Sequence, residues 1–174
     1  MILGCGASPP APTPAPAPST EEAAAAEDEA APEAETPTTP EEPAIVERLL
    51  PFDDERKTLT VAYREAHQGT FKATGDLEAD TSMEPRAIVL HWTAGETADS
   101  AWNTFAPTRL PGRPDLADAG AVNVSAHYLV ERDGTIARLM PDTRVGRHVI
   151  GLNHVAIGIE NVGGTATTPL TWPR

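Results

Sequence analysis

A histidine and a glutamate stand where their side chains could do chemistry. His91 follows the apolar residues 87–90 in the stretch AIVLHWTAG, and Glu160 ends the stretch AIGIE. A carboxylate in such an apolar segment must face a cleft, be paired, or lie near a cation. An imidazole ligand and a carboxylate acting as general base toward a metal-activated water are the parts of a metal hydrolase. The alternative for His91 is a strand-capping histidine with a hydrogen-bonded ring, and spacing alone leaves both interpretations open.

The residues around each of these side chains predict a strand that positions it. Residues 87–91 begin with four apolar residues in a row, which indicates a buried strand ending at His91. Residues 154–164 contain a second strand, in which Gly158 shares a face with Glu160 and leaves room beside the carboxylate. Where the two strand ends converge, we expect the imidazole and the carboxylate to lie in one site.

Two helices are also predicted. The first has Asp53 as its N-cap and stops at Gly69, and the second opens at Thr97 or Asp99. The apolar face of the first helix is expected to contain Leu59, Ala62, Tyr63 and Ala66. We expect the tryptophans Trp92 and Trp102 to belong to the core rather than to a substrate platform.

A hairpin and a loop complete the expected elements. Residues 122–141 alternate as strand residues do on either side of an Asp133-Gly134 turn, which predicts a β-hairpin. The Pro- and Gly-rich residues 108–120 predict a loop. Helices combined with strands and a hairpin indicate an α/β or α+β fold, and we expect a mixed central β-sheet flanked by helices.

The first 44 residues differ from the rest in composition. Residues 6–44 are almost entirely Ala, Pro, Glu, Thr and Ser, without Val, Ile, Leu or an aromatic side chain. Such a segment cannot bury enough apolar surface to offset the entropy of ordering. We therefore expect a disordered linker over 1–44 and a folded domain over 45–174.

Charge excludes one class of partner. Residues 1–44 hold 9 of the 26 acidic groups and none of the 13 basic ones, so most of the net charge of −13 belongs to that segment. The remainder holds 17 acidic and 13 basic groups and has no basic stripe. Nucleic-acid binding needs a basic footprint and is not expected. No apolar run approaches membrane-spanning length either.

The single cysteine, Cys5, lies in MILGCGAS at the head of the acidic segment. A lone cysteine forms no internal disulfide and is a weak metal candidate. The residues before it resemble a bacterial lipobox, in which the cysteine is lipidated, although the charged and long apolar regions of a signal peptide do not precede it. We expect a lipid anchor on Cys5 and a place in the cell envelope, with the true start upstream; the alternative is a chance match.

Three motifs in order give the chain a family resemblance: IVLHWTAG, VSAHYLVERDGTIARLMP and GLNHVAIGIENVGG. They resemble the zinc-dependent N-acetylmuramoyl-L-alanine amidases, the family that includes lysozymes of the phage T7 type, AmpD type amidases and peptidoglycan recognition proteins. The resemblance covers residues 87–164. It implies that His91 is a zinc ligand and that Glu160 is the catalytic acid/base.

The resemblance also implies a substrate groove. The stretch RHVIGLNH corresponds to its lining, which makes His148, Asn153 and His154 candidate substrate-binding residues. For His148 and His154, plain surface positions are an equal alternative. His127, in the hairpin beside the site, is a further substrate-binding candidate, and for its ring we favour burial with hydrogen bonds over zinc ligation.

The chain departs from the family pattern in its ligand set. A catalytic zinc takes three protein ligands and keeps one position open for water, and only His91 matches a family ligand here. We expect the remaining ligands beyond Arg174, in a domain that is incomplete at its C-terminus; the alternative is that His127, His148 or His154 completes the site. Two functions remain: hydrolysis of the bond between N-acetylmuramic acid and L-alanine in peptidoglycan or muropeptides, or peptidoglycan binding without catalysis. We expect a monomer.

Overall fold

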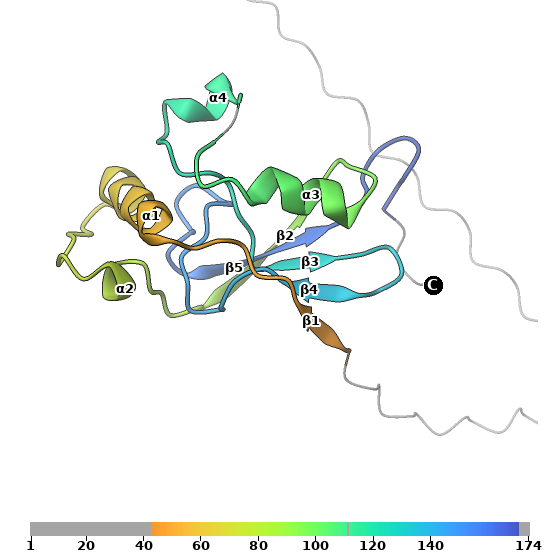
Figure 1. Ribbon diagram of the computed structural model, residues 1–174, viewed down its shortest axis with the longest axis horizontal. Coiled ribbons are helices and arrows are strands. Elements are labelled where there is room, and N and C mark those ends of the chain that lie inside the picture. Colours follow the sequence, from red (N-terminus) through yellow and green to blue (C-terminus); the bar gives the residue numbers. More distant parts are fainter. Residues whose placement is uncertain (1–42, 111, 171–174) are drawn as a thin grey trace, which may run out of the picture. The chain divides into compact units, whose positions relative to one another are not determined.

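Five strands form one mixed sheet in the computed structural model, which describes residues 43–110 and 112–170 (Figure 1). The predictions for Cys5 and for nearly all of the segment 1–44 lie outside the described residues. The strands follow the order β1-β4-β3-β5-β2 across the sheet. Their bounds are β1 Ile45–Glu47, β2 Ala87–Trp92, β3 Tyr128–Val130, β4 Ile136–Arg138 and β5 Ala156–Asn161.

The sheet combines one antiparallel pair of strands with three parallel pairs, and the sequence predicted the antiparallel one. β3 and β4 form the antiparallel hairpin around the Asp133-Gly134 turn. β5 runs parallel to both β2 and β3, and β1 runs parallel to β4. β1 was not predicted, because its three side chains are all exposed and leave no periodic pattern in the sequence. The predicted mixed α/β fold is confirmed.

Two of the four helices among the described residues were predicted. α1 spans Asp54–His67, and the Asp53 side chain caps it by accepting from the Arg56 backbone N–H at 2.8 Å. α3 spans Ala98–Phe105 with Thr97 as its N-cap. The two four-residue helices are α2, Leu77–Asp80, and α4, Pro114–Ala117; α4 lies in the segment expected to be a loop. No helix of the described part is long and apolar enough to cross a membrane.

The buried face of α1 matches the predicted apolar one only in part, because Tyr63 is buried as expected but two alanines are not. Ala62 and Ala66 are exposed, whereas Arg56 is fully enclosed. Its guanidinium donates to the carbonyl oxygens of Pro51 at 2.8 Å and Phe105 at 2.6 Å. The carbonyls at the end of a helix have no intrahelical partner, so the arginine satisfies the end of α3. The burial of Arg56 was not predicted, because its contact with Phe105 joins residues far apart in the sequence.

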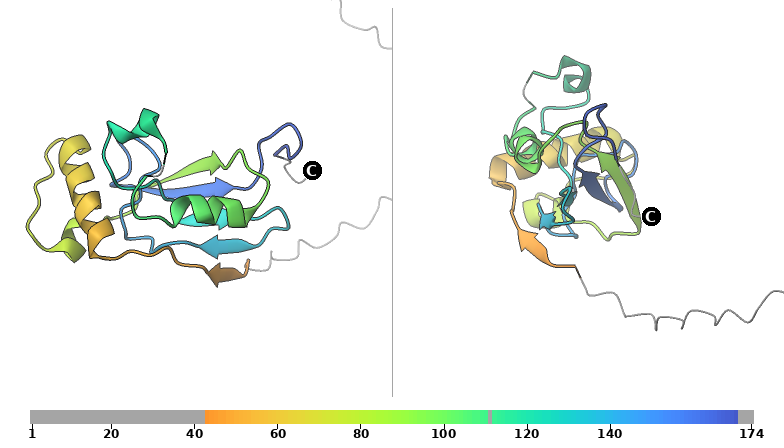
Figure 2. Two further views of the ribbon diagram at one scale, coloured as in Figure 1. Left: turned by 45° about the horizontal axis from the view of Figure 1, so that its top comes forward. Right: turned by 90° about the vertical axis from the view of Figure 1, so that its right-hand side faces the viewer.

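The core lies between α3 and one face of the sheet. Ala101 and Phe105 of α3 pack in one cluster with Leu129 of β3 and Ala137 of β4, and all four are buried. Figure 2 shows α3 lying over the strands, with α1 at the end of the sheet where β5 begins. This arrangement leaves the carboxyl ends of β2 and β5 at the other end of the sheet.

The opposite face of β2 is largely exposed. Ile88, Leu90 and Trp92 are 63%, 57% and 59% exposed, so the predictions of a buried strand and of a core Trp92 were wrong. Side chains alternate across a strand, and the face that carries His91 is the more buried one. Trp102, by contrast, packs partly buried against the core and donates its indole N–H to Arg48 O at 3.1 Å.

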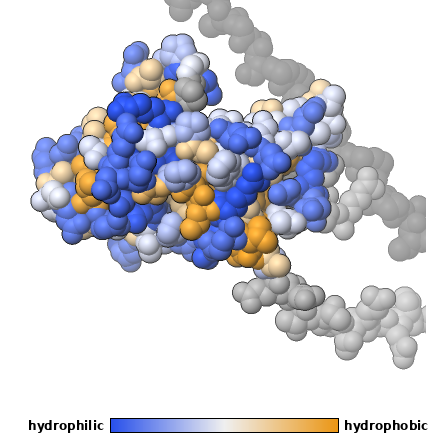
Figure 3. Space-filling view, viewed as in Figure 1, coloured by the Kyte–Doolittle hydropathy of each residue, from blue (hydrophilic) through white to orange (hydrophobic). Residues whose placement is uncertain are grey.

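The surface seen from the side of Figure 1 is mainly hydrophilic (Figure 3). Hydrophobic side chains are exposed where Figure 1 draws β1, and Ile45, Val46 and Leu49 are 46%, 47% and 52% exposed. Isolated exposed apolar residues are normal on protein surfaces. This edge therefore gives no evidence of a site.

Candidate active site

His91 and Glu160 come together at the carboxyl ends of two parallel strands. They are register partners on β2 and β5, so their side chains leave the same face of the sheet. Ligands of open α/β sheets bind outside the carboxyl ends of the strands. The sequence predicted that these two strand ends converge, and the register places them side by side.

A third side chain, His148, joins this pair from the loop before β5. Its Nδ1 lies 3.1 Å from His91 Nε2, and the two rings meet edge to face with centroids 5.3 Å apart. The ring lies directly over Gly158, where an added Cβ would come within 2.7 Å of His148 Cγ. Gly158 does leave room, as predicted, but the room is filled by His148.

Hydrogen bonds determine where the protons of the two rings lie. The Ala156 carbonyl can only accept, so His148 Nε2, 3.0 Å away, must carry the proton and donate it. A neutral His148 then accepts at Nδ1, and His91 Nε2 donates to it. This series of hydrogen bonds leaves His91 Nδ1 unprotonated, with its lone pair free. A metal-binding histidine requires this arrangement.

Burial keeps both rings neutral at physiological pH. Loss of solvent lowers the pKa of His91 and lowers that of His148 to about 4. In His148 the neighbouring His127 and His91 lower the pKa further, against the opposing effect of the Ala156 carbonyl. Neutral imidazole is the form that binds metal ions.

The pKa of Glu160 is shifted upward, in the opposite direction to the pKa values of the two histidines. Burial raises the pKa of its carboxyl from 4.5 to about 7, because the charged form loses its solvation. Its Oε2 is buried and has no hydrogen-bond partner. An unpaired buried carboxyl with a pKa close to neutrality can both take up and release a proton, which is the requirement for a general acid/base.

A groove of about 230 Å³ opens beside these groups. It lies between α3 and the ends of β2 and β5. Its lining combines apolar, hydroxyl and cationic side chains with His148 and Glu160. The lining residues are Trp92, Thr93, Ala101, Thr104, Phe105, Arg113, Val124, Ser125, Arg147, His148 and Glu160.

Arg147 is a groove residue that sequence reasoning missed. It is almost fully buried, and its guanidinium donates to the backbone carbonyls of Leu116, at 2.8 Å, and Gly120, at 2.9 Å. These hydrogen bonds connect the segment that contains α4 to a residue of the groove lining. Its position directly before His148 was the only available signal, and sequence alone does not reveal which way an arginine in a loop points.

His127 does not line the groove. It is fully buried; its Nε2 donates to Arg144 O at 2.8 Å, and its Nδ1 accepts from the Gly158 backbone N–H at 3.0 Å. Both ring nitrogens are therefore used within the protein, and neither substrate nor metal has access to them. The prediction of substrate contact is corrected to the alternative, a buried hydrogen-bonded ring.

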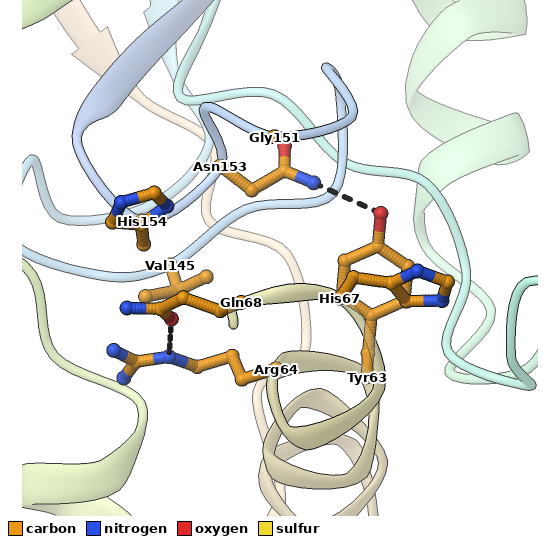
Figure 4. A pocket seen from close by; sticks show the side chains of 8 residues that line it. All are labelled: Tyr63, Arg64, His67, Gln68, Val145, Gly151, Asn153 and His154. Carbon is orange, nitrogen blue, oxygen red and sulfur yellow. Dashed lines mark hydrogen bonds between the residues drawn. The ribbon is translucent and has the colours of Figure 1, made fainter. Parts of the chain in front are cut away.

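Asn153 and His154 also lie away from the groove. Asn153 is 6% exposed, and both ends of its carboxamide bond to other parts of the chain. His154 lines a separate small pocket between α1 and the loop before β5, which Figure 4 shows. Of the four predicted substrate-binding residues, the structure places only His148 in the groove.

The donor set does not amount to a complete zinc site. Among residues 43–110 and 112–170, no group of three or more His, Cys, Asp or Glu side chains is arranged to hold a metal ion. His91 has the free Nδ1 of a ligand, but a catalytic zinc requires three protein ligands. The described residues thus fit one ligand of such a site and not the whole of it.

The sequence that forms this fold and site matches the model of a known protein family. The family model for N-acetylmuramoyl-L-alanine amidase matches residues 81–173, which is more than half of the chain. The match contains β2, the hairpin and β5, and with them His91, His148 and Glu160. The chain belongs to the N-acetylmuramoyl-L-alanine amidase family.

Individual relatives are similar over parts of their length. The endolysin of Escherichia phage T7 is 38% identical over 47 residues, which are 27% of this chain and 31% of the endolysin. The chain thus spans about a third of the curated relatives that it matches.

Solved structures also show partial similarity. The amidase LysC from Clostridium intestinale matches with a TM-score of 0.37 and 21% identity over 70% of this chain and 60% of that one. Peptidoglycan recognition protein-LE, solved with a monomeric diaminopimelic acid-type peptidoglycan, matches with a TM-score of 0.34 and 23% identity over 48% and 49% of the two chains.

Proposed function

We propose that this protein hydrolyses the amide bond between N-acetylmuramic acid and L-alanine in peptidoglycan or muropeptides. The observation that carries the proposal is the pairing of His91 with Glu160, whose Oε2 is buried without a partner and whose side chain lines a groove, in a chain of the amidase family. A binding module without catalysis has no need of a carboxyl with a pKa near neutrality.

Glu160 is the proton carrier in this proposal. With a pKa of about 7, part of the population is ionised at neutral pH and can take a proton from the attacking water. The protonated carboxyl can then give that proton to the amine of L-alanine as the amide bond breaks. Because the groove partly encloses Glu160, water and substrate reach the carboxyl from one side.

We further propose that zinc is the metal and that His91 Nδ1 is one of its ligands. Its support is the hydrogen-bond chain through His148, which leaves that nitrogen unprotonated. The other ligands come from outside the described residues. A zinc ion at such a site supplies Lewis acidity, which acidifies water and polarises a carbonyl.

Two substitutions separate the proposed ligand from the proposed base. In the protein expressed from its complete gene, Glu160→Gln keeps size and hydrogen bonding but removes proton transfer, and turnover should fall about 10²- to 10⁴-fold with zinc retained. His91→Ala should lower both zinc per chain and activity. The assays are metal analysis and release of stem peptide from muropeptides. Near wild-type turnover of Glu160→Gln would show that the carboxylate is structural. Binding of muropeptides without any stem-peptide release by the unsubstituted protein would instead favour the binding module.

We also propose that the protein is a lipoprotein of the cell envelope, attached through Cys5 by way of the segment 1–44 and acting as a monomer. The support is the lipobox-like sequence ILGC and the Ala/Pro/Glu-rich composition that follows it. Labelling of cells with a radioactive fatty acid should mark the protein, and Cys5→Ser should abolish the label. Retention of the label in that variant would contradict the proposal.

A further inference from the structure

Asn153 connects α1 to the loop that carries His148. Its Oδ1 accepts the backbone N–H groups of both His148 and Val149 at 2.8 Å. Its Nδ2 donates to the hydroxyl of Tyr63 at 3.2 Å, a contact that Figure 4 shows. One side chain thus holds two consecutive backbone groups of the loop and is itself held by a helix.

The two backbone N–H groups determine which end of the carboxamide faces the loop, because they can only donate and therefore require the carbonyl oxygen. The NH₂ end is left to donate to the Tyr63 hydroxyl, which holds it in place. Tyr63 is 6% exposed, and its ring is packed by the Arg147 guanidinium, 4.9 Å from the ring centre, and by the His67 ring at 4.5 Å. Buried N–H groups need an acceptor, and here one oxygen serves both.

The position of the His148 backbone determines the position of its ring. Nε2 of the ring donates a hydrogen bond to the Ala156 carbonyl. Nδ1 accepts a hydrogen bond from His91 Nε2, which lies 3.1 Å away. A small movement of the loop would break this second bond, because hydrogen bonds weaken steeply with distance and angle. His91 would then be free to carry its proton on either nitrogen.

We propose that Asn153, anchored by Tyr63, is a positioning residue that holds His148 against His91 and thereby keeps the His91 proton on Nε2. The consequence for metal binding and catalysis rests on the proposed function, but the hydrogen-bond relay itself does not. Asn153 acts from the interior, with 6% of its surface exposed, and touches no substrate.

The test is carried out on the 174-residue chain at neutral pH without metal or substrate. Nitrogen-15 NMR of the imidazole rings reports which ring nitrogen of His91 is protonated, and hydrogen exchange reports the protection of the His148 and Val149 amides. Asn153→Ala removes the acceptor. Asn153→Asp keeps it and can accept a hydrogen bond from the Tyr63 hydroxyl, so it serves as the rescue variant. Asn103→Ala, at an exposed asparagine of α3, is the matched control.

We expect the unsubstituted chain and the Asn103→Ala and Asn153→Asp variants to show His91 protonated on Nε2 and both amides protected. Asn153→Ala should lose the single His91 tautomer and the protection of both amides. A folded Asn153→Ala variant with the original tautomer and protection would overturn the proposal. Failure of Asn153→Asp to restore them would also overturn it.

A second variant decides the question if Asn153→Ala does not fold. Tyr63→Phe removes only the hydroxyl that accepts from Asn153, and Tyr128→Phe removes a hydroxyl that donates to Asp142 on a different part of the fold. Exchange of the His148 and Val149 amides should accelerate in Tyr63→Phe and stay unchanged in Tyr128→Phe. Equal exchange in the two variants would contradict a role for Tyr63 and Asn153. None of these readouts depends on amidase activity, so their failure is distinguishable from failure of the proposed function.

Discussion

His91 and Glu160 face each other across one pair of parallel strands, and burial drives both toward their neutral forms. The pKa of the imidazole is lowered and that of the carboxyl is raised, in each case chiefly because the charged form is desolvated. At neutral pH the pair therefore offers an unprotonated ring nitrogen beside a carboxyl that can exchange a proton. A single cause, desolvation by burial, prepares both groups for their different roles.

Glu160 should make the stability of the protein depend on pH. Its folded pKa of about 7 lies above its ordinary value of 4.5, so between these values the folded state binds more protons than the unfolded state. The free energy of unfolding should therefore fall as pH rises through this window. Glu160→Gln should lack this loss, which denaturant unfolding of both proteins from pH 4 to pH 8 would measure.

The histidines contribute with the opposite sign, so the comparison must be made between the two proteins. The folded pKa values of His91, His127 and His148 are lowered, and stability from these groups rises with pH up to about their ordinary value of 6.5. The stability of Glu160→Gln minus that of the unsubstituted chain should increase with pH and level off above about pH 7. A constant difference would show that the carboxyl titrates normally.

The sequence predicted the elements that depend on local patterns. Apolar runs, a capping Asp53 and an Asp-Gly turn are readable within a few residues, and β2, α1 and the hairpin are found where these patterns place them. The convergence of His91 and Glu160 followed from two strand ends. Each of these inferences needed only the neighbouring residues or one pairing.

The features that sequence reasoning missed depend on contacts between distant residues. His148 meets His91 across 57 positions of sequence, and Arg56 reaches the end of α3 across 49. No periodicity records such a contact. The exposure of Trp92 depends on which other elements cover β2, which residues 87–92 cannot indicate by themselves.

The ligand set predicts weak zinc binding by the 174-residue chain. One imidazole beside a carboxyl does not provide the three-ligand geometry of a catalytic zinc, so little or no zinc should remain after dialysis. Metal analysis of the dialysed protein, with His91→Ala as the baseline, measures this. One tightly held zinc per chain would contradict the prediction. His148→Ala would then be the first variant to examine, because its Nδ1 lies beside His91.

Composition predicts that the N-terminal segment is dispensable for folding. Residues 1–44 contain almost no side chains able to form a core, so a protein that starts at Ile45 should keep its thermal midpoint within about one degree or two of the original. Calorimetry of the two proteins at one pH and salt concentration makes the comparison. A large fall in the midpoint would show that this segment packs on the domain.

Gly158 provides the last prediction, because it is the position on which the His148 ring rests. A Cβ there would lie 2.7 Å from His148 Cγ, so Gly158→Ala should displace the ring and cost about 1–3 kcal/mol of stability, as overpacking does. Gly95→Ala is the matched control, since its added Cβ would meet Thr93 at an ordinary 3.5 Å and its backbone φ is outside the left-handed region.

The two glycine variants should also differ at His91. Displacement of His148 removes the acceptor of the His91 Nε2 proton, so imidazole NMR should show a second His91 tautomer in Gly158→Ala and a single one in Gly95→Ala. Denaturant unfolding measures the stability of both. If Gly158→Ala is as stable as Gly95→Ala and keeps the single tautomer, the His148 ring can accommodate the added methyl group. The close contact at Gly158 would then not be what holds His148 in place.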